Sequence, residues 1–226
     1  MPDVLDVPEE EIPDGTDDAE TEASAEALRA PPARKRPKPG ERRVQILQTL
    51  ASMLEQPGAD RITTAALAAK LAVSEAALYR HFASKAQMFE GLIEFIESSV
   101  FTLVNQITER EGSGAVQAQK MVAVLLQFGE KNPGMTRVMV GDALVFEHER
   151  LSLRMNQFFD RVESQLRTSL RAAAEAAGSP TPTVDAQALA SALTSLAIGR
   201  LQRYARSGFK RLPTEHLEPA LHRLTT

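Results

Sequence analysis

The sequence predicts an all-α chain made of a disordered N-terminal tail, a small three-helix domain and a larger helical domain. Three observations support this prediction. From Glu41 onward the apolar residues recur at helical spacing, with no alternating strand pattern and no internal repeat. Three capping residues, Thr63, Ser74 and Ser84, follow one another at intervals of about ten residues. The first 40 residues are acidic, rich in proline and poor in large apolar residues.

We divide the chain into a tail at 1–40, a small helical domain at 41–88 and a larger helical domain at 89–226. A length of 226 residues allows one or two domains, and 43% hydrophobic residues are enough to build a core. The absence of cysteine excludes disulfides, thiolate metal ligands and a cysteine nucleophile. The longest apolar run, Met121 to Leu126, is too short to cross a bilayer, and the acidic start does not resemble a secretion signal. We expect a soluble cytoplasmic protein without a membrane span.

The net charge of −4 conceals a strong asymmetry along the chain. Residues 1–30 contain eleven acidic residues and one basic residue, whereas residues 31–43 contain six basic residues and one acidic residue. The tail cannot bury enough apolar surface to offset the entropy cost of ordering, so we expect it to be disordered. Its basic end is either a solvated charge run or an arm that binds DNA phosphates or the minor groove. The residues of this arm are Arg34, Lys35, Arg36 and Lys38.

Apolar periodicity and Pro or Gly breaks place the helices in order. In the first helix the apolar face is marked by Val44, Leu47, Leu50, Ala51 and Leu54, and Pro57-Gly58 ends it. The helices that follow cover about 63–71, 74–82, 84–110, 115–131, 148–177 and 184–207, with a further segment at 135–147 and a short helix after Pro213.

The stretch from Arg61 to Phe89 is the most informative part of the sequence. Thr63 and Ser74 each precede a short apolar-periodic segment, and Ser84 with Gln87 forms an S-x-x-Q capping box before a long one. Hydrophobic staples accompany the first two caps, with Ile62 and Leu67 at one and Val73 and Leu78 at the other. Two short helices joined by a tight turn and followed by a long helix make a helix-turn-helix arrangement.

The second short helix combines a core face with a face suited to DNA. Small side chains such as Ala76 and Ala77 let a helix approach base edges. Tyr79 and His81 can donate hydrogen bonds to phosphates, and Lys85 lies in the first turn of a helix whose free amides favour an anion. A small helical subdomain without a ligand is the alternative. The predicted DNA-binding residues are Thr63, Thr64, Ser74, Glu75, Ala76, Ala77, Tyr79, Arg80, His81 and Lys85.

The segment VSEAALYRHFASK resembles the DNA-binding helix-turn-helix of the TetR family. The longer segments RITTAALAAKLAVSEAALYRHFASKAQMFEGLIEFIESS and FGEKNPGMTRVMVGDALVFE resemble the branch of this family that acts in nucleoid occlusion. The resemblance extends from about Arg42 to Lys210. It implies a homodimer that binds palindromic sites on chromosomal DNA at the nucleoid. It further implies that the DNA-bound dimer contacts the tubulin-like division protein FtsZ and blocks assembly of its ring over the chromosome.

The same resemblance assigns Phe95, Lys131 and Asn132 to the surface that faces FtsZ. From the residues alone, Phe95 is equally compatible with the core, because its helix is apolar nearly all round. The sequence departs from the family at Ala72, where this turn usually has glycine. If that position requires a positive φ, alanine there costs on the order of 1 kcal/mol.

In the C-terminal half, two stripes at helical spacing are candidates for a four-helix dimer interface. One contains Phe158, Val162, Leu166, Ser169, Leu170 and Ala173, and the other contains the small residues Ala188, Ala192, Ser195 and Gly199. Burial in the core of a single chain is the alternative for both stripes.

We find no nucleophile–base set, no metal-ligand spacing around the four histidines and no nucleotide-binding loop, and we expect neither an enzyme nor a cofactor. Glu147 and Glu149 are expected on a solvated face. The main alternative function is a ligand-responsive repressor of the same family, which would need a sizeable apolar pocket.

Overall fold

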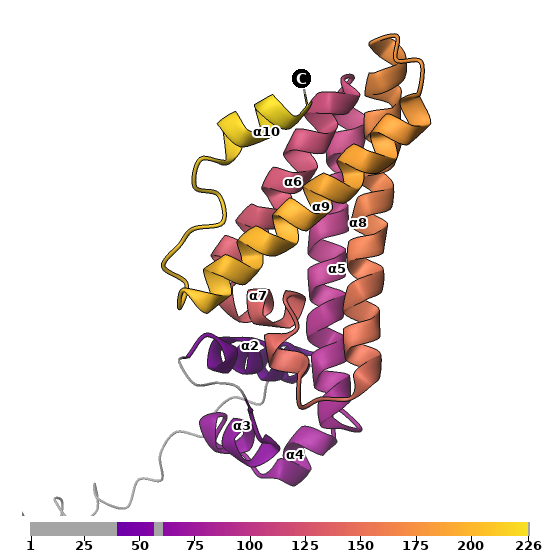
Figure 1. Ribbon diagram of the computed structural model, residues 1–226. Helices are drawn as coiled ribbons and strands as arrows, with labels where there is room; N and C mark the ends of the chain where they lie inside the picture. The colour runs from indigo at the N-terminus through magenta and orange to yellow at the C-terminus, as the bar shows by residue number, and fades with distance from the viewer. Residues whose placement is uncertain (1–39, 57–60, 226) are drawn as a thin grey trace, which may run out of the picture. The chain divides into compact units, whose positions relative to one another are not determined.

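The computed structural model describes residues 40–56 and 61–225, and within these ranges every regular element is a helix (Figure 1). The predicted all-α fold is therefore confirmed, whereas the tail and its basic arm lie outside the described residues. The elements are α2 (Glu41–Leu54), α3 (Thr64–Lys70), α4 (Glu75–Tyr79), α5 (Lys85–Arg110), α6 (Gly114–Lys131), α7 (Pro133–Met139), the 3₁₀ turn η1 (Asp142–Leu144), α8 (Glu149–Ala176), α9 (Pro182–Arg206) and α10 (Leu217–Thr225).

The predicted helix positions agree closely with this order, but one prediction about the first helix is wrong. Ile46, Leu50 and Leu54 are the buried residues of α2, whereas Val44 is 53% exposed. Val44 lies in the first turn, before the first buried residue Ile46. The segment at 135–147 divides into α7 and η1, because Gly141 adopts a left-handed φ of 85° and ends the helical path.

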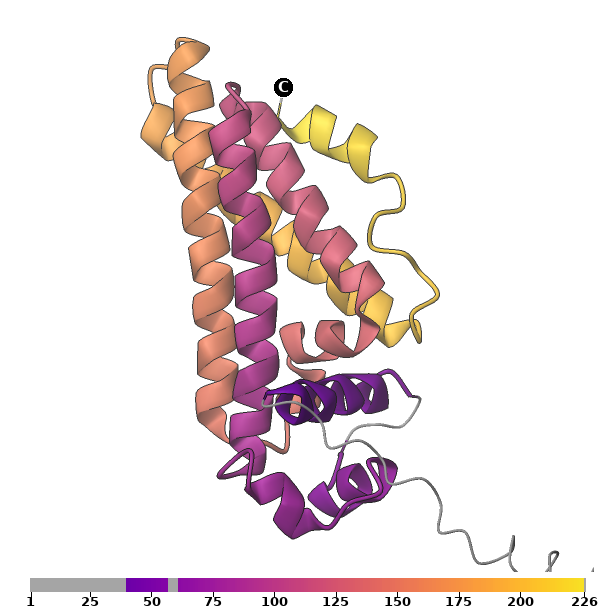
Figure 2. The same ribbon diagram turned by 180° about the vertical axis from the view of Figure 1, so that it is seen from behind.

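Helix α5 is common to both ends of the molecule. Its first half buries Met88, Phe89 and Leu92 beside α2, and its second half buries Val100 and Val104 between α6 and α8. Figures 1 and 2 show α5 and α8 running side by side, with α9 crossing them and α2, α3 and α4 gathered at the N-terminal end of α5. The buried residues of these helices form one continuous hydrophobic core.

Two glycines, Gly134 of α7 and Gly129 of α6, let these helices pack closely against their neighbours. A Cβ on Gly134 would lie 2.1 Å from the Ala51 carbonyl oxygen of α2, so the two backbones touch at this point. A Cβ on Gly129 would lie 2.4 Å from a Leu201 methyl of α9. The fully buried Thr136 donates its hydroxyl to the Gly129 carbonyl at 2.8 Å, which satisfies this buried polar group.

The two stripes of the C-terminal half have different environments. The α8 stripe from Phe158 to Leu170 is buried within the chain, against α6 and α9, so its assignment to a dimer interface is wrong. The small residues of α9 face outward instead. Ala188, Ala192 and Ser195 are exposed, and a Cβ on Gly199 would meet nothing within 4 Å.

Ala72 has a φ of 51°, which confirms the positive φ expected at the turn between α3 and α4. We predict that Ala72→Gly raises the free energy of unfolding by about 1 kcal/mol, because alanine is strained in the left-handed region and glycine is not. For a domain of this size the melting temperature should rise by about 2–4 °C.

Ala69→Gly is the matched control, because Ala69 is also exposed but lies inside α3. It should lose about 0.5–1 kcal/mol. Equal destabilisation of both variants in a denaturant titration would refute the strain at Ala72.

Candidate nucleic-acid interface

The small helices begin at the three predicted capping residues. The Thr63 hydroxyl accepts the Ala66 N–H at 3.1 Å, and the Ser74 hydroxyl accepts the Ala77 N–H at 3.3 Å. The Ser84 hydroxyl accepts the Gln87 N–H at 3.2 Å. The capping box is modified, because the Gln87 side chain accepts the N–H of Ala83 at 2.8 Å rather than that of Ser84. These caps fix where α3, α4 and α5 begin and therefore set the geometry of the turn.

The face of α4 that was predicted to approach DNA is open to solvent. Leu78 and Phe82 are buried beneath it, while Ala76, Arg80 and His81 are exposed and Tyr79 is 45% exposed. Ala77 is half-buried. A small central surface flanked by hydroxyl, imidazole and guanidinium groups is the combination that groove entry with phosphate contacts requires.

Two of the predicted DNA-binding residues pair with each other across the turn. The Thr64 hydroxyl donates to Glu75 Oε2 at 2.5 Å and joins the start of α3 to the start of α4. Glu75 is the one acidic residue between Arg61 and Lys85. Its carboxylate is therefore hydrogen-bonded within the protein, next to the surface where phosphates would lie. Thr63 and Ser74 are likewise engaged as caps, which makes them positioning residues as well as candidates for contact.

Lys85 has an unexpected partner. Its ammonium group forms an ion pair with Glu147, which follows η1, and the two side chains are 23% and 9% exposed. The expectation that Glu147 lies on a solvated face is therefore wrong, whereas Glu149 is exposed. The sequence could not indicate this pair, because its members lie 62 residues apart.

Two further ion pairs join α5 to α8. Arg150 Nε lies 2.8 Å from Glu90 Oε1, and Arg154 binds both carboxylate oxygens of Glu97, at 2.6 and 3.3 Å. The hydrogen bonds that Arg154 donates to Glu97 raise the pKa of Arg154. The start of α8 is thus fixed along the first half of α5.

Sequence reasoning missed Arg43 as a positioning residue. Its guanidinium lies over the Phe82 ring at 4.1 Å and donates to the His81 carbonyl at 2.9 Å, so α2 supports the end of α4. The sequence shows the pair Arg42-Arg43 about one turn before the first buried position of α2, but the partner of Arg43 could not be known from it. The predicted arm of Arg34, Lys35, Arg36 and Lys38 lies outside the described residues.

The three residues assigned to a partner surface lie near one another on α5 and α6. Phe95 is 48% exposed and is therefore not a core residue. Its ring centroid is 6.2 Å from that of Phe128, and Asn132 Nδ2 donates to the Phe128 carbonyl at 2.8 Å. Lys131 is exposed in the last turn of the same helix. We call Phe95, Phe128, Lys131 and Asn132 the aromatic patch.

Metal sites and membrane spans are absent from the described part of the chain. No three His, Asp or Glu side chains there come together in a way that could hold a metal ion. None of the helices within residues 40–56 and 61–225 has the length and apolar character needed to cross a bilayer.

A cavity of about 630 Å³ lies where the ends of α6, α8, α9 and α10 meet, and alanine side chains form much of its lining.

Capped short helices, a tight turn and a helical bundle behind them define a bacterial DNA-binding regulator of the TetR type. Two family models match the chain, "Bacterial regulatory proteins, tetR family" at residues 46–92 and "Tetracyclin repressor-like, C-terminal domain" of the SlmA-like kind at residues 113–226. The chain belongs to the SlmA family within the TetR-type regulators.

Relatives named nucleoid occlusion factor SlmA share about half of their residues with this chain. The protein from Idiomarina loihiensis is 52% identical over 175 residues, which cover 77% of this chain and 89% of the relative. The protein from Vibrio cholerae is 51% identical over 178 residues, which cover 78% and 90%.

Solved structures support the fold at low sequence identity. The TetR-family regulator PfmR of Thermus thermophilus has a TM-score of 0.65 and 19% identity, covering 80% of this chain and 94% of its own. The regulator FadR of Bacillus subtilis, solved in complex with stearoyl-CoA, has a TM-score of 0.64 and 11% identity, covering 81% and 97%.

We predict that Tyr79→Phe weakens binding to every DNA sequence by roughly 10-fold or more, because a hydrogen bond to a charged group contributes about 1.5–3 kcal/mol. Ala76→Glu should abolish binding, since a carboxylate would face the bases and phosphates, whereas Ala76→Ser should retain it. Fluorescence anisotropy with genomic fragments that the protein enriches is the measurement. Normal binding by folded Ala76→Glu would exclude α4 as the recognition helix.

We also predict that Glu147→Gln strengthens DNA binding several-fold at low salt, because it removes the charge that competes with phosphate for Lys85. Glu149→Gln is the control, since it changes the net charge equally at an exposed neighbouring position. If both variants change the affinity to the same extent, the effect is one of overall charge, and Lys85 does not contact DNA.

Proposed function

We propose that this chain is a nucleoid occlusion factor that, as a DNA-bound homodimer, inhibits FtsZ ring assembly over the chromosome. The observation that carries the proposal is the identity of about 52% to proteins named nucleoid occlusion factor SlmA, spread over about nine-tenths of their length. Such a factor acts at the nucleoid and needs three surfaces: one for DNA, one for a second copy and one for the division protein. The described helices offer a candidate for each.

The DNA surface is the exposed face of α4 with the ends of α3 and α5, within a DNA-binding domain at 41–88. Two such domains related by two-fold symmetry would bind half-sites about one helical turn apart on a palindromic sequence. The small-residue face of α9 supports the dimer, because Ala188, Ala192 and Ser195 are exposed and permit close approach of a second helix. The remaining helical domain, 89–226, then carries both the dimer contact and the partner surface.

The aromatic patch supports the contact with FtsZ. An exposed phenylalanine beside a second, tilted aromatic ring, with an exposed lysine three residues after that second ring, can bind a partner segment that combines an apolar anchor with a carboxylate. Ile93 and Ile96, on the same helix, are fully buried. Phe95 lies on a different side of that helix, so its ring is directed outward. The energetic cost of exposing this ring is consistent with an intermolecular role.

A ligand-responsive repressor is the alternative, and it requires a ligand site in the body. The cavity of about 630 Å³ is the largest candidate described, but its alanine-rich lining offers few groups for specific recognition. A thermal-shift screen tests this alternative, since a ligand at 100 times its dissociation constant would add about 2.7 kcal/mol of stability.

The deciding experiment measures sedimentation of GTP-assembled FtsZ from the same organism in the presence of this protein. The assay is run without DNA, with genomic fragments that the protein enriches and with unrelated DNA. We expect the sedimented polymer to decrease only with the enriched fragments. Unchanged polymer in tubes where DNA binding is verified would place the protein among ordinary repressors.

We predict that Phe95→Ala abolishes the loss of polymer but leaves DNA affinity unchanged, because the aromatic patch is distinct from the exposed face of α4. Leu224→Ala on α10 is the control, since Leu224 is also a large apolar side chain and is 45% exposed. It should behave as the wild type in both assays. Full inhibition by Phe95→Ala would remove the aromatic patch from the FtsZ contact.

A further inference from the structure

The end of α9 and the loop after it carry an unusually dense set of positive charges. From Ile198 to Leu212 there are five basic residues and no acidic residue. We call these residues, Arg200, Arg203, Arg206, Lys210 and Arg211, the basic flank. None of them forms an ion pair with another side chain of residues 40–56 or 61–225. Such a cluster repels itself unless an anion binds to it.

The basic flank is held in a fixed conformation. Arg200 Nη1 donates to the carbonyls of Pro213 and Glu215, at 3.0 and 2.7 Å. The Ser207 hydroxyl accepts the N–H groups of Lys210 and Arg211, at 3.0 and 2.9 Å. These bonds orient the cations before any ligand arrives, which reduces the entropy cost of binding.

Buried aromatic packing anchors the same loop to the bundle. The buried Tyr204 donates its hydroxyl to the Glu130 carbonyl at 3.0 Å, and its ring centroid lies 5.1 Å from that of Phe209. The guanidinium of Arg137 on α7 lies 5.5 Å from the Phe209 centroid. The loop is therefore connected to both α6 and α7.

Three arginines of the basic flank surround a small cavity. Arg200, Arg203 and Arg211 line it, together with one carboxylate, that of Glu215, and with His216, and its volume is about 170 Å³. The Glu215 carboxylate lies 3.7 Å from His216 Nε2, and the Glu130 carboxylate accepts the Thr214 hydroxyl. Converging guanidinium groups of this kind match the oxygens of a phosphate group.

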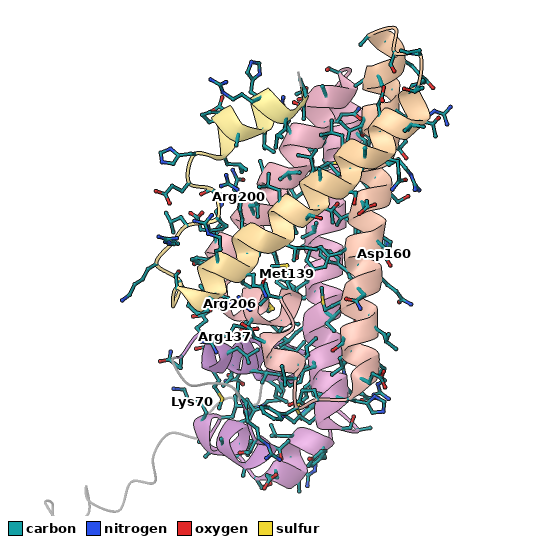
Figure 3. All side chains as sticks on the ribbon, viewed as in Figure 1. Lys70, Arg137, Met139, Asp160, Arg200 and Arg206 are labelled. Atoms are coloured by element: carbon teal, nitrogen blue, oxygen red, sulfur yellow. The ribbon has the colours of Figure 1, made fainter. Side chains whose placement is uncertain are left out.

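The basic flank is continuous with the DNA-binding helices. In Figure 3 the labelled residues Lys70, Arg137, Arg206 and Arg200 follow one another up one side of the molecule, from α3 through α7 to α9. Figures 1 and 2 agree that the end of α9 lies on the side of the bundle away from α8, next to α7, and α7 in turn packs on α2. A second stretch of backbone phosphates could therefore follow this side of the protein while the exposed face of α4 occupies its own site.

We propose that the basic flank is a second, sequence-independent DNA-binding surface, which takes the phosphodiester backbone of a duplex segment other than the half-site under α4. That segment is either the flanking DNA of the same molecule or a separate duplex. The apolar content of the surface disfavours a lipid bilayer, because Leu212 is the one large exposed apolar side chain between Ile198 and Leu212.

The test compares the full-length wild type with Arg203→Gln/Arg211→Gln on three DNA substrates. The first is a short duplex that contains only the protein's own site, trimmed by footprinting. The second has the same site at the centre of a long duplex. In the third, the short duplex is fixed on beads, and capture of a labelled second duplex without the site is measured. Arg110→Gln/Arg223→Gln is the control, because both arginines are exposed elsewhere and the charge change is equal.

We expect the double variant to bind the short duplex as the wild type does. It should lose affinity for the long duplex or in capture of the second duplex. There the slope of log K against log salt concentration should become shallower by about 2, because each lost phosphate contact removes about one unit. Loss on the long duplex identifies flanking DNA, and loss of capture identifies a separate duplex. Arg203→Lys/Arg211→Lys should restore binding, because the proposed contacts need charge rather than base recognition.

The proposal is overturned if the double variant equals the wild type on the long duplex and in capture. It is also overturned if the short duplex is weakened as much as the long one, because the basic flank would then serve the ordinary site. Capture of phosphatidylglycerol vesicles in place of the second duplex would assign the surface to lipid. Failure of the FtsZ assay would leave this result intact, since no division protein is present in the test.

Discussion

The contact between α2 and α7 is the constraint on which the rest of the structure depends. A Cβ on Gly134 would lie 2.1 Å from the Ala51 carbonyl oxygen, so no side chain separates the two helices. Arg43 of the same α2 supports the end of α4 by lying over Phe82. Helices α3 and α4 therefore rest on α2, and α2 rests on α7, which packs in turn on α9. Because packed interiors transmit small displacements, the position of α4 is coupled mechanically to the body.

The local part of this arrangement could be predicted, because its causes lie within a few residues. Thr63, Ser74 and Ser84 cap helices where the sequence pattern places them, and Ala72 adopts the positive φ that its position in the turn requires. The Lys85–Glu147 pair could not be predicted, because charge patterns along the chain do not specify contacts between distant segments. Glu147 also shows that a charged residue can be nearly buried when a cation faces it.

Apolar periodicity predicted helices reliably but could not predict what each apolar face contacts. The α8 stripe around Phe158 and Leu166 has the same pattern whether it packs within the chain or against a second copy, and here it packs within the chain. Phe95 presents the opposite case, because a helix that is apolar nearly all round has no polar face to distinguish its outer side from its inner side. Its exposure beside Phe128 follows from how α6 packs on α5, which is a tertiary property.

The candidate DNA and partner surfaces share one helix, and this suggests how DNA could control the partner contact. Lys85 in the first turn of α5 and Phe95 are ten residues apart, so about 15 Å of uninterrupted helix separates them. The ion pairs of Glu90 and Glu97 with α8 hold this stretch against the body. If a phosphate binds Lys85 in place of Glu147, the segment between η1 and α8 loses its ion pair with α5. The ion pairs of Arg150 with Glu90 and of Arg154 with Glu97 remain. Phe95 and Phe128 belong to different helices, so the spacing of the aromatic patch depends on the packing of α5 against α6.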